Sequence, residues 1–285
     1  MVIAIEDDFD LDKIIGCGQC FRPRRLADGR YLFLTGRHCL HLVPLADGRL
    51  RADCTPRAWQ EVWAPYFDLG RDYAAIRRAI PPADAFLRAA AAEGAGIRIL
   101  RQNAWEMLVT FILSQRKSIP AIRTAVEQLC TRFGRPLTGH GAGEFAFPAP
   151  AALAAASPEA LAACGLGYRV PYVQDAARQV RTGALNLAAL AAADDETLLA
   201  ALLGVHGVGR KVASCVGLFA YGRCACAPVD VWIERIIARQ YGGQNPFCAF
   251  GENAGVLQQY LFYHALQAKS TLRPAAPAPA ERGRV

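Results

Sequence analysis

The segment with the most specific chemistry in this chain is the glycine-rich turn from Val205 to Lys211. Gly207 and Gly209 lack a β-carbon, so the backbone there can turn tightly and approach a ligand closely. The amide groups around Gly207 then begin a predicted helix, whose N-terminus suits a phosphate group with Arg210 adding charge. A glycine turn that merely joins two packed helices is the alternative that this segment leaves open.

Lys211 stands out because the chain has 32 lysine and arginine residues, of which four are lysines. In the first turn of a helix, burial and the positive helix terminus lower the pKa of a lysine from its usual value of about 10.4. The neutral amine is a nucleophile, whereas an arginine stays protonated and cannot take this role. A solvated or phosphate-contacting cation is the alternative interpretation of Lys211.

An aspartate follows at Pro228-Val-Asp230, directly before an amphipathic segment that begins at Val231. Aspartate at such a place is an ordinary helix N-cap, worth about 1 kcal/mol. The same carboxylate stays ionised at a helix N-terminus and can stabilise positive charge that develops nearby. We expect Asp230 to have both roles.

The elements that position these residues are predicted by hydrophobic spacing. The first 65 or so residues alternate short apolar runs with Asp-Gly turns, which is typical of antiparallel strands joined by hairpins. From Asp72 onward, apolar residues recur every three or four positions, as they do in helices. We therefore predict an α+β fold with an N-terminal antiparallel β-sheet domain with peripheral helices (1–95), a mainly α-helical region (96–270) with a helical hairpin (195–221), and a flexible Pro/Ala-rich tail (271–285).

Composition excludes several classes of protein. With 53% apolar and 20% charged residues the chain is neither disordered nor fibrous, and no apolar run reaches the roughly 20 residues of a membrane helix. The first residues do not resemble a secretion signal, so we expect a cytoplasmic protein. The ten cysteines and five histidines lack metal-ligand spacing, which predicts neither a metal site nor an iron–sulfur cluster. A net charge of +7 permits a polyanionic partner without identifying one.

Several segments, in the right order, resemble the helix-hairpin-helix (HhH-GPD) DNA glycosylases, and look most like their 8-oxoguanine DNA glycosylase branch. Val205–Lys211 resembles the hairpin with its nucleophilic lysine, and Asp230 lies at the family's distance from that lysine. Cys17-Gly-Gln-Cys-Phe-Arg22 resembles the G-Q-S-F-R segment of the branch. The other resembling segments are Phe111-Ile-Leu-Ser-Gln115, Val126–Cys130, Gly165-Leu-Gly-Tyr-Arg169 and Gly255-x-x-Gln258-x-x-x-Phe262.

The resemblance implies how a damaged base is held after it has flipped out of the duplex. Cys215 and Phe262 would sandwich the base, while Gln258 would bond its Watson–Crick edge. Gly18 offers only its backbone, but guanine N7 is an acceptor whereas 8-oxoguanine carries a hydrogen there, so one carbonyl distinguishes the two. Core packing of Cys215 and Phe262, and a simple turn at Gly18, are the alternatives.

The resemblance also implies contacts with the DNA around the flipped base. Tyr168 and Arg169 would fill the vacated stack and contact the orphaned cytosine, although an ordinary surface loop is the alternative. Arg116 stands where better-known members have an asparagine that contacts this cytosine, and Ala121 where they have an arginine, so the opposite-base preference stays open. The predicted DNA-binding residues are Arg116, Tyr168, Arg169, Gly207, Gly209 and Arg210.

The activity implied is removal of 8-oxoguanine from duplex DNA, in which Lys211 attacks C1′, forms a Schiff base and cleaves the strand by β-elimination. A glycosylase for other lesions such as alkylated purines typically lacks this lysine, and a non-catalytic helix-hairpin-helix module needs neither Lys211 nor Asp230; both remain alternatives. The expected partner is double-stranded DNA containing oxidised guanine, bound by a monomer without a cofactor or a membrane. We expect a bacterial-type cytoplasmic location, associated with the nucleoid when bound to DNA. Backbone carbonyls of the hairpin are a candidate site for a monovalent ion.

Overall fold

The structure is a computed structural model that describes residues 1–137 and 143–271. Its strands are β1 (Val2–Ile3), β2 (Arg24–Arg25), β3 (Tyr31–Thr35), β4 (His38–Pro44) and β5 (Leu50–Ala52). Its α-helices are α1 (Leu11–Gly16), α2 (Pro56–Ala58), α3 (Ala64–Tyr66), α4 (Tyr73–Arg78), α5 (Ala85–Glu93), α6 (Ala104–Ser114), α7 (Ile119–Phe133), α8 (Pro150–Ala155), α9 (Pro158–Ala162), α10 (Val170–Thr182), α11 (Asp195–Leu203), α12 (Arg210–Tyr221), α13 (Val231–Gln240) and α14 (Ala254–Thr271). A π-helical turn covers Trp59–Trp63, and 3₁₀ turns cover Gly167–Arg169, Ala189–Ala191 and Pro246–Asn253.

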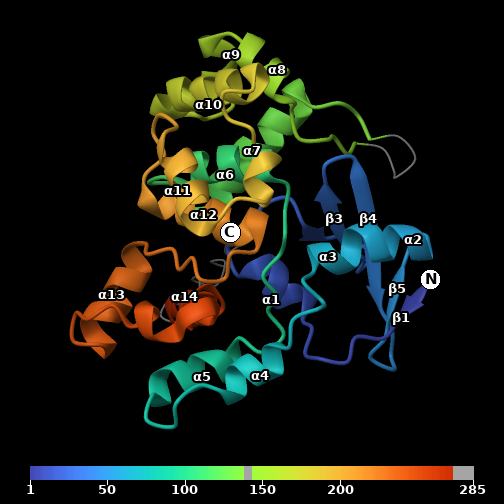
Figure 1. Cartoon of the computed structure of the whole chain (residues 1–285). Helices are drawn as coiled ribbons and strands as arrows, with labels where there is room; N and C mark the ends of the chain where they lie inside the picture. The colour runs from blue at the N-terminus through green and yellow to red at the C-terminus, as the bar shows by residue number, and fades with distance from the viewer. Residues whose placement is uncertain (138–142, 272–285) are drawn as a thin grey trace, which may run out of the picture.

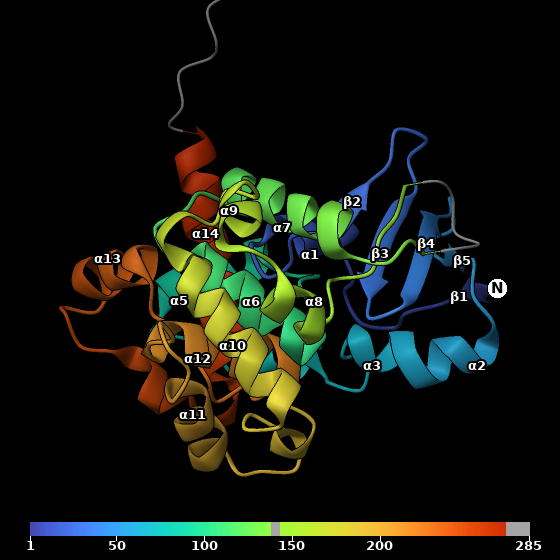
Figure 2. The same cartoon turned by 90° about the horizontal axis from the view of Figure 1, so that it is seen from above.

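The five strands form one antiparallel sheet in the order β1-β5-β4-β3-β2. The Asp-Gly turns connect β2 to β3 and β4 to β5, with Gly29 and Gly48 at positive φ as such turns require. Helices α2 and α3 and the turn between them cover one face of the sheet (Figures 1 and 2). There Phe33 of β3 packs edge-on against Phe67, with ring centroids 4.9 Å apart. The predicted N-terminal antiparallel sheet is confirmed.

The remainder of the described chain is mainly helical, as predicted. Helix α6 lies at its centre, where every residue from Trp105 to Leu113 is buried, and it packs against α7, α10 and α12 (Figure 1). Helix α5 packs against α14, so chain segments on both sides of residue 95 share one core. The division at residue 95 stays a prediction, and the predicted tail lies outside the described residues except for Thr271. Within residues 1–137 and 143–271, no helix combines the length and apolar character needed to cross a membrane.

A buried ion pair joins the sheet region to α6. Arg22 is 4% exposed, and its guanidinium lies 3.2 Å from the carboxylate of Glu106 in the first turn of α6. The same guanidinium also donates to the backbone carbonyl of Phe145. Burial raises the pKa of Glu106, and the neighbouring guanidinium opposes that rise. Arg22 therefore fixes the Cys17–Arg22 segment against helix α6.

We expect Arg22→Met to lower the free energy of unfolding by about 3 kcal/mol, because it leaves the Glu106 carboxylate buried without its partner. Urea unfolding monitored by circular dichroism measures this loss. Adding Glu106→Gln to Arg22→Met should recover part of it, since no unpaired charge then remains. Arg57→Met is the matched control, because the Arg57–Glu61 pair is exposed and should contribute less than about 0.5 kcal/mol. Equal losses in Arg22→Met and Arg57→Met would contradict the prediction.

Candidate active site

The hairpin between α11 and α12 positions Lys211. Val205 and Val208 are buried and hold the turn against the core, while Gly207 has a φ of +80°. A β-carbon at Gly207 would lie 2.4 Å from the ring of Tyr172, so only glycine fits there. Gly209 is the N-cap residue of α12, which places Lys211 in the first turn of that helix, as predicted.

The amine of Lys211 is held by the end of α6. Its Nζ lies 3.3 Å from the Oγ of Ser114, which in turn donates to the Phe111 carbonyl at 2.8 Å. The Lys211 Nζ also lies 5.2 Å from the centroid of the Phe111 ring. Sequence reasoning assigned no role to Ser114 or Phe111. Their spacing of three residues puts both on one face of a predicted helix, which was the available signal.

Asp230 caps helix α13. Its Oδ1 accepts hydrogen bonds from the backbone amides of Trp232 and Ile233, both at 3.0 Å. One carboxylate oxygen is thus used by the cap, and the residue also lines the cavity that contains Lys211. Asp230 is therefore the N-cap of α13, as predicted, and its carboxylate lies in the lining of the cavity that also contains Lys211.

The predicted catalytic and base-binding residues meet around a single small cavity. Its volume is about 40 Å³, far below the roughly 300 to 1,000 Å³ that small-molecule sites usually have. Six of its lining residues were predicted from the sequence: Gly18, Lys211, Cys215, Asp230, Gln258 and Phe262. The other four were not predicted to line it: Phe111, Phe219, Pro228 and Gln259.

Phe262 closes this cavity over Gly18. A β-carbon at Gly18 would lie 2.8 Å from Cε1 of Phe262, so the ring rests directly on the glycine backbone. Gly18 has a φ of +80°, which also favours glycine. The cavity is therefore too small for a purine base, and the Phe262 ring on Gly18 is one of the groups that narrow it.

Gln258 and Cys215 supply the polar and polarisable atoms of the cavity. Gln258 is 4% exposed, and its Oε1 is buried without a hydrogen-bond partner among the described residues. A buried acceptor of this kind needs a donor, and an N–H group of a bound base in the cavity would supply one. Burial raises the pKa of the Cys215 thiol, with the charge of Lys211 opposing this rise and that of Asp230 adding to it.

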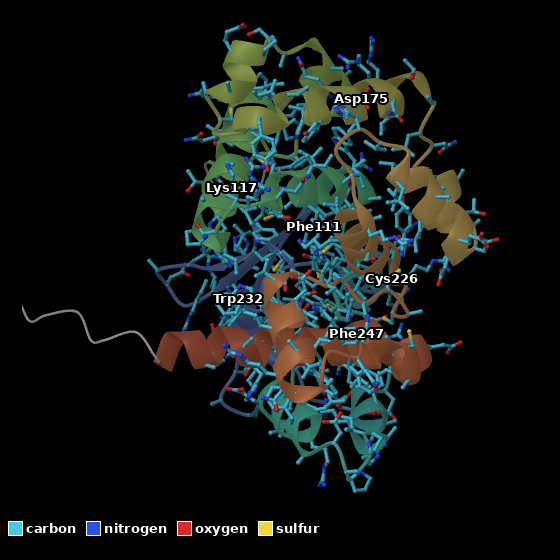
Figure 3. All side chains as sticks on the ribbon, turned by 90° about the vertical axis from the view of Figure 1, so that its left-hand side faces the viewer. Phe111, Lys117, Asp175, Cys226, Trp232 and Phe247 are labelled. Atoms are coloured by element: carbon cyan, nitrogen blue, oxygen red, sulfur yellow. The ribbon has the colours of Figure 1, made fainter. Side chains whose placement is uncertain are left out.

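A wider groove of about 290 Å³ adjoins the cavity and shares several of its lining residues. Lys117, Ile119 and Trp232 are among its lining residues, and Figure 3 labels Lys117 and Trp232. The pKa of Lys117 is lowered, first by burial and then by the charge of Arg169. The groove gives a path from the surface to Lys211.

The predicted DNA-binding residues lie on three loops that hydrogen bonds connect. The side chain of Gln115 donates to the Gly207 carbonyl at 2.9 Å, and Lys117 donates to the Gly165 carbonyl. Arg169 is 5% exposed and donates to the carbonyls of Leu166 and Gln115, so it holds two of these loops together.

The other side chains of the predicted DNA-binding set are accessible. Arg116 is exposed and has a φ of +50°, and Arg210 is exposed beside the hairpin. Tyr168 is 51% exposed, with the guanidinium of Arg169 4.2 Å from its ring centroid. Their contacts with DNA remain predictions, and Arg169 would have to exchange backbone carbonyls for DNA atoms. Among the described residues, no group of three or more His, Cys, Asp or Glu side chains could hold a metal ion.

The chain is similar to known proteins along most of its length. Residues 1–108 match the family model described as "8-oxoguanine DNA glycosylase, N-terminal domain", and residues 109–246 match "HhH-GPD superfamily base excision DNA repair protein". A probable N-glycosylase/DNA lyase from Methanothermobacter thermautotrophicus is 27% identical, over 90% of this chain and 94% of its own length.

Two solved structures share the fold over nearly their full lengths. MBOgg1 in complex with a low-affinity DNA ligand has 36% identity and a TM-score of 0.88, covering 94% of this chain and 96% of its own. The Clostridium acetobutylicum 8-oxoguanine glycosylase/lyase, in complex with dsDNA containing cytosine opposite 8-oxoG, has 29% identity and a TM-score of 0.86, covering 94% and 95%. This chain therefore belongs to the 8-oxoguanine DNA glycosylase branch of the HhH-GPD superfamily of base excision DNA repair proteins.

Proposed function

We propose that this protein excises 8-oxoguanine from duplex DNA and then cleaves the strand as an AP lyase. The observation that carries the proposal is that Lys211 and Asp230 line the same cavity as Gln258, whose buried Oε1 has no partner among the described residues. A nucleophile, a carboxylate and an unpaired acceptor around one small cavity suit excision of a base that carries N–H donors. The similarity to a glycosylase/lyase solved with DNA containing 8-oxoG supports this substrate.

Base recognition follows from the acceptors of the cavity. The target base leaves the stack at a cost of a few kcal/mol and enters between Cys215 and Phe262, whose ring moves off Gly18. The Oε1 of Gln258 accepts from the Watson–Crick edge of the purine, while the Gly18 carbonyl accepts the N7 hydrogen of 8-oxoguanine. Guanine would instead place the N7 lone pair against this carbonyl, and two acceptors cannot pair.

The chemistry uses Lys211 as the nucleophile. Its neutral amine forms a bond to C1′ as the C1′–N9 bond breaks, and the electron pair leaves with the base, which takes up a proton. The carboxylate of Asp230 stabilises the positive charge that develops on the sugar. Opening of the sugar gives a Schiff base, loss of a C2′ proton expels the 3′ phosphate, and water then releases the enzyme.

The remaining expectations rest on the sequence and stay proposals. They are a monomeric enzyme in a bacterial-type cytoplasm, associated with the nucleoid when bound to DNA, and catalysis without a cofactor. A monovalent ion at the hairpin carbonyls is likewise proposed. Lys211 disfavours the alkylpurine alternative, because that branch typically lacks the nucleophilic lysine.

A trapping experiment with a panel of duplexes tests the proposed function. Borohydride reduces a Schiff base to a stable protein–DNA adduct, so we expect an adduct with a duplex carrying 8-oxoguanine opposite cytosine. A duplex with an alkylated purine and an undamaged duplex should give none. If base release or the adduct occurred only with the alkylpurine duplex, the substrate would be an alkylated purine. If the protein bound DNA but gave neither base release nor an adduct, it would be a non-catalytic DNA-binding module. Changing the base opposite the lesion measures the preference that Arg116 and Ala121 leave open.

A further inference from the structure

The segment that carries Gly18 is held on both sides by buried glutamine side chains. The Nε2 of Gln259, on α14, donates to the Cys17 carbonyl at 2.6 Å, and the Nε2 of Gln102 donates to the Gln19 carbonyl at 2.9 Å. Gln259 is 2% exposed and Gln102 is 8% exposed. The side-chain amides of two residues far apart in the chain therefore donate hydrogen bonds to the carbonyls on either side of Gly18.

Gln19 anchors the same segment from within. Its side chain accepts from the Leu100 amide at 2.8 Å and donates to the Arg98 carbonyl at 2.7 Å. Of the three consecutive carbonyls of residues 17 to 19, the middle one, of Gly18, has no donor within residues 1–137 and 143–271. The neighbouring acceptors are thus occupied by fixed donors, and the Gly18 carbonyl is left for a ligand in the cavity.

We infer that Gln259, with Gln102 as its counterpart, is a positioning residue that fixes the Gly18 carbonyl for reading the N7 hydrogen of 8-oxoguanine. This inference rests on the proposed function. Gln259 is adjacent to Gln258, so one turn of α14 both reads the Watson–Crick edge and sets the acceptor for N7. A glycine at positive φ has unusual backbone freedom, and external hydrogen bonds restrict it.

The position of one carbonyl affects base excision more than strand cleavage. Excision of 8-oxoguanine needs the base to be seated against Gly18, whereas cleavage at a preformed abasic site needs Lys211 and no base. Removing the Gln259 amide should therefore separate the two activities. A purely structural role would lower both together.

The experiment compares Gln259→Met and Gln102→Met with wild type in single-turnover assays on two substrates, an 8-oxoguanine duplex and a duplex with a preformed abasic site. Each variant should slow excision by about 10- to 100-fold, because a carbonyl next to Gly18 loses its donor and the Gly18 carbonyl is no longer held in place. Cleavage at the abasic site should change by less than about threefold. Gln174→Met is the matched control, since Gln174 makes the same kind of bond, to the Ala156 carbonyl at 3.0 Å, without lining the cavity. It should leave both rates unchanged.

A binding measurement gives a second readout of discrimination. In the Lys211→Gln background, which performs no chemistry, Gln259→Met should lower the preference for 8-oxoguanine over guanine duplexes about tenfold, with unchanged affinity for a tetrahydrofuran abasic analogue. Equal losses of excision and abasic cleavage in both glutamine variants, or wild-type values throughout, would overturn the inference. If Gln259→Met does not fold, Gln102→Met decides the question by the same criteria. Wild-type protein that leaves 8-oxoguanine intact would instead overturn the proposed function itself.

Discussion

Replacing Lys211 by glutamine is expected to abolish both excision and the borohydride-trapped adduct. Loss of a nucleophile in other enzymes lowers the rate by several orders of magnitude, so we expect a reduction on the order of 10⁴-fold or more. Lys211→Arg should be equally inactive, because the guanidinium keeps the positive charge but stays protonated and cannot attack carbon. Single-turnover excision and adduct yield measure the effect, and binding to an abasic analogue checks that the site remains folded.

Lys117 provides the matched control, because it also lines the groove leading to the cavity. Lys117→Gln should still form the adduct. An adduct that persists in Lys211→Gln and disappears in Lys117→Gln would assign the nucleophile to Lys117 and contradict the mechanism. We expect Lys117→Gln to keep the adduct because the contact with Ser114 holds the Lys211 amine at the cavity wall.

Replacing Asp230 by asparagine is expected to slow excision on the order of 10³-fold with little change in stability. Asparagine is as good an N-cap as aspartate, so the hydrogen bonds to the amides of Trp232 and Ile233 can persist. What is lost is the negative charge that stabilises the developing positive charge on the sugar. The free energy of unfolding of Asp230→Asn should stay within about 0.5 kcal/mol of wild type.

Two further variants separate the cap from the charge. Asp230→Ala removes both, so it should lose about 1 kcal/mol of stability in addition to activity. Asp194→Asn, at the N-cap of α11, changes a matched capping aspartate away from the cavity and should leave excision unchanged. Excision by Asp230→Asn at the wild-type rate would limit Asp230 to a capping role. Urea unfolding and single-turnover excision of the same preparations distinguish these results.

Local sequence signals predicted much of the secondary structure. Helix α7 (Ile119–Phe133) shows the predicted three- and four-residue apolar spacing in its buried residues, and the Ser118 side chain caps it. The capping role of Asp230 was predicted in the same way. These signals act between residues three or four positions apart, so they can be read without a tertiary structure.

The sequence also predicted which residues share a face, though it could not predict how the faces meet. Lys211 with Cys215, and Gln258 with Phe262, are each four residues apart on one helix. The structure places all four around one cavity and shows that the Phe262 ring covers Gly18. The closed state of the cavity follows from packing between α14 and the segment after α1, which periodicity does not describe.

The α+β arrangement, the hairpin that presents Lys211 and the aspartate that caps α13 can be predicted from the sequence. Two contacts depend instead on the folding of the whole chain: Ser114 holds the Lys211 amine across 97 positions, and Gln259 holds the Cys17 carbonyl across 242 positions. A glutamine in a helix can face any of many carbonyls, and its spacing carries no information about which one. The contacts that set the site were therefore hidden from the sequence, because they depend on where distant segments come together in the folded chain.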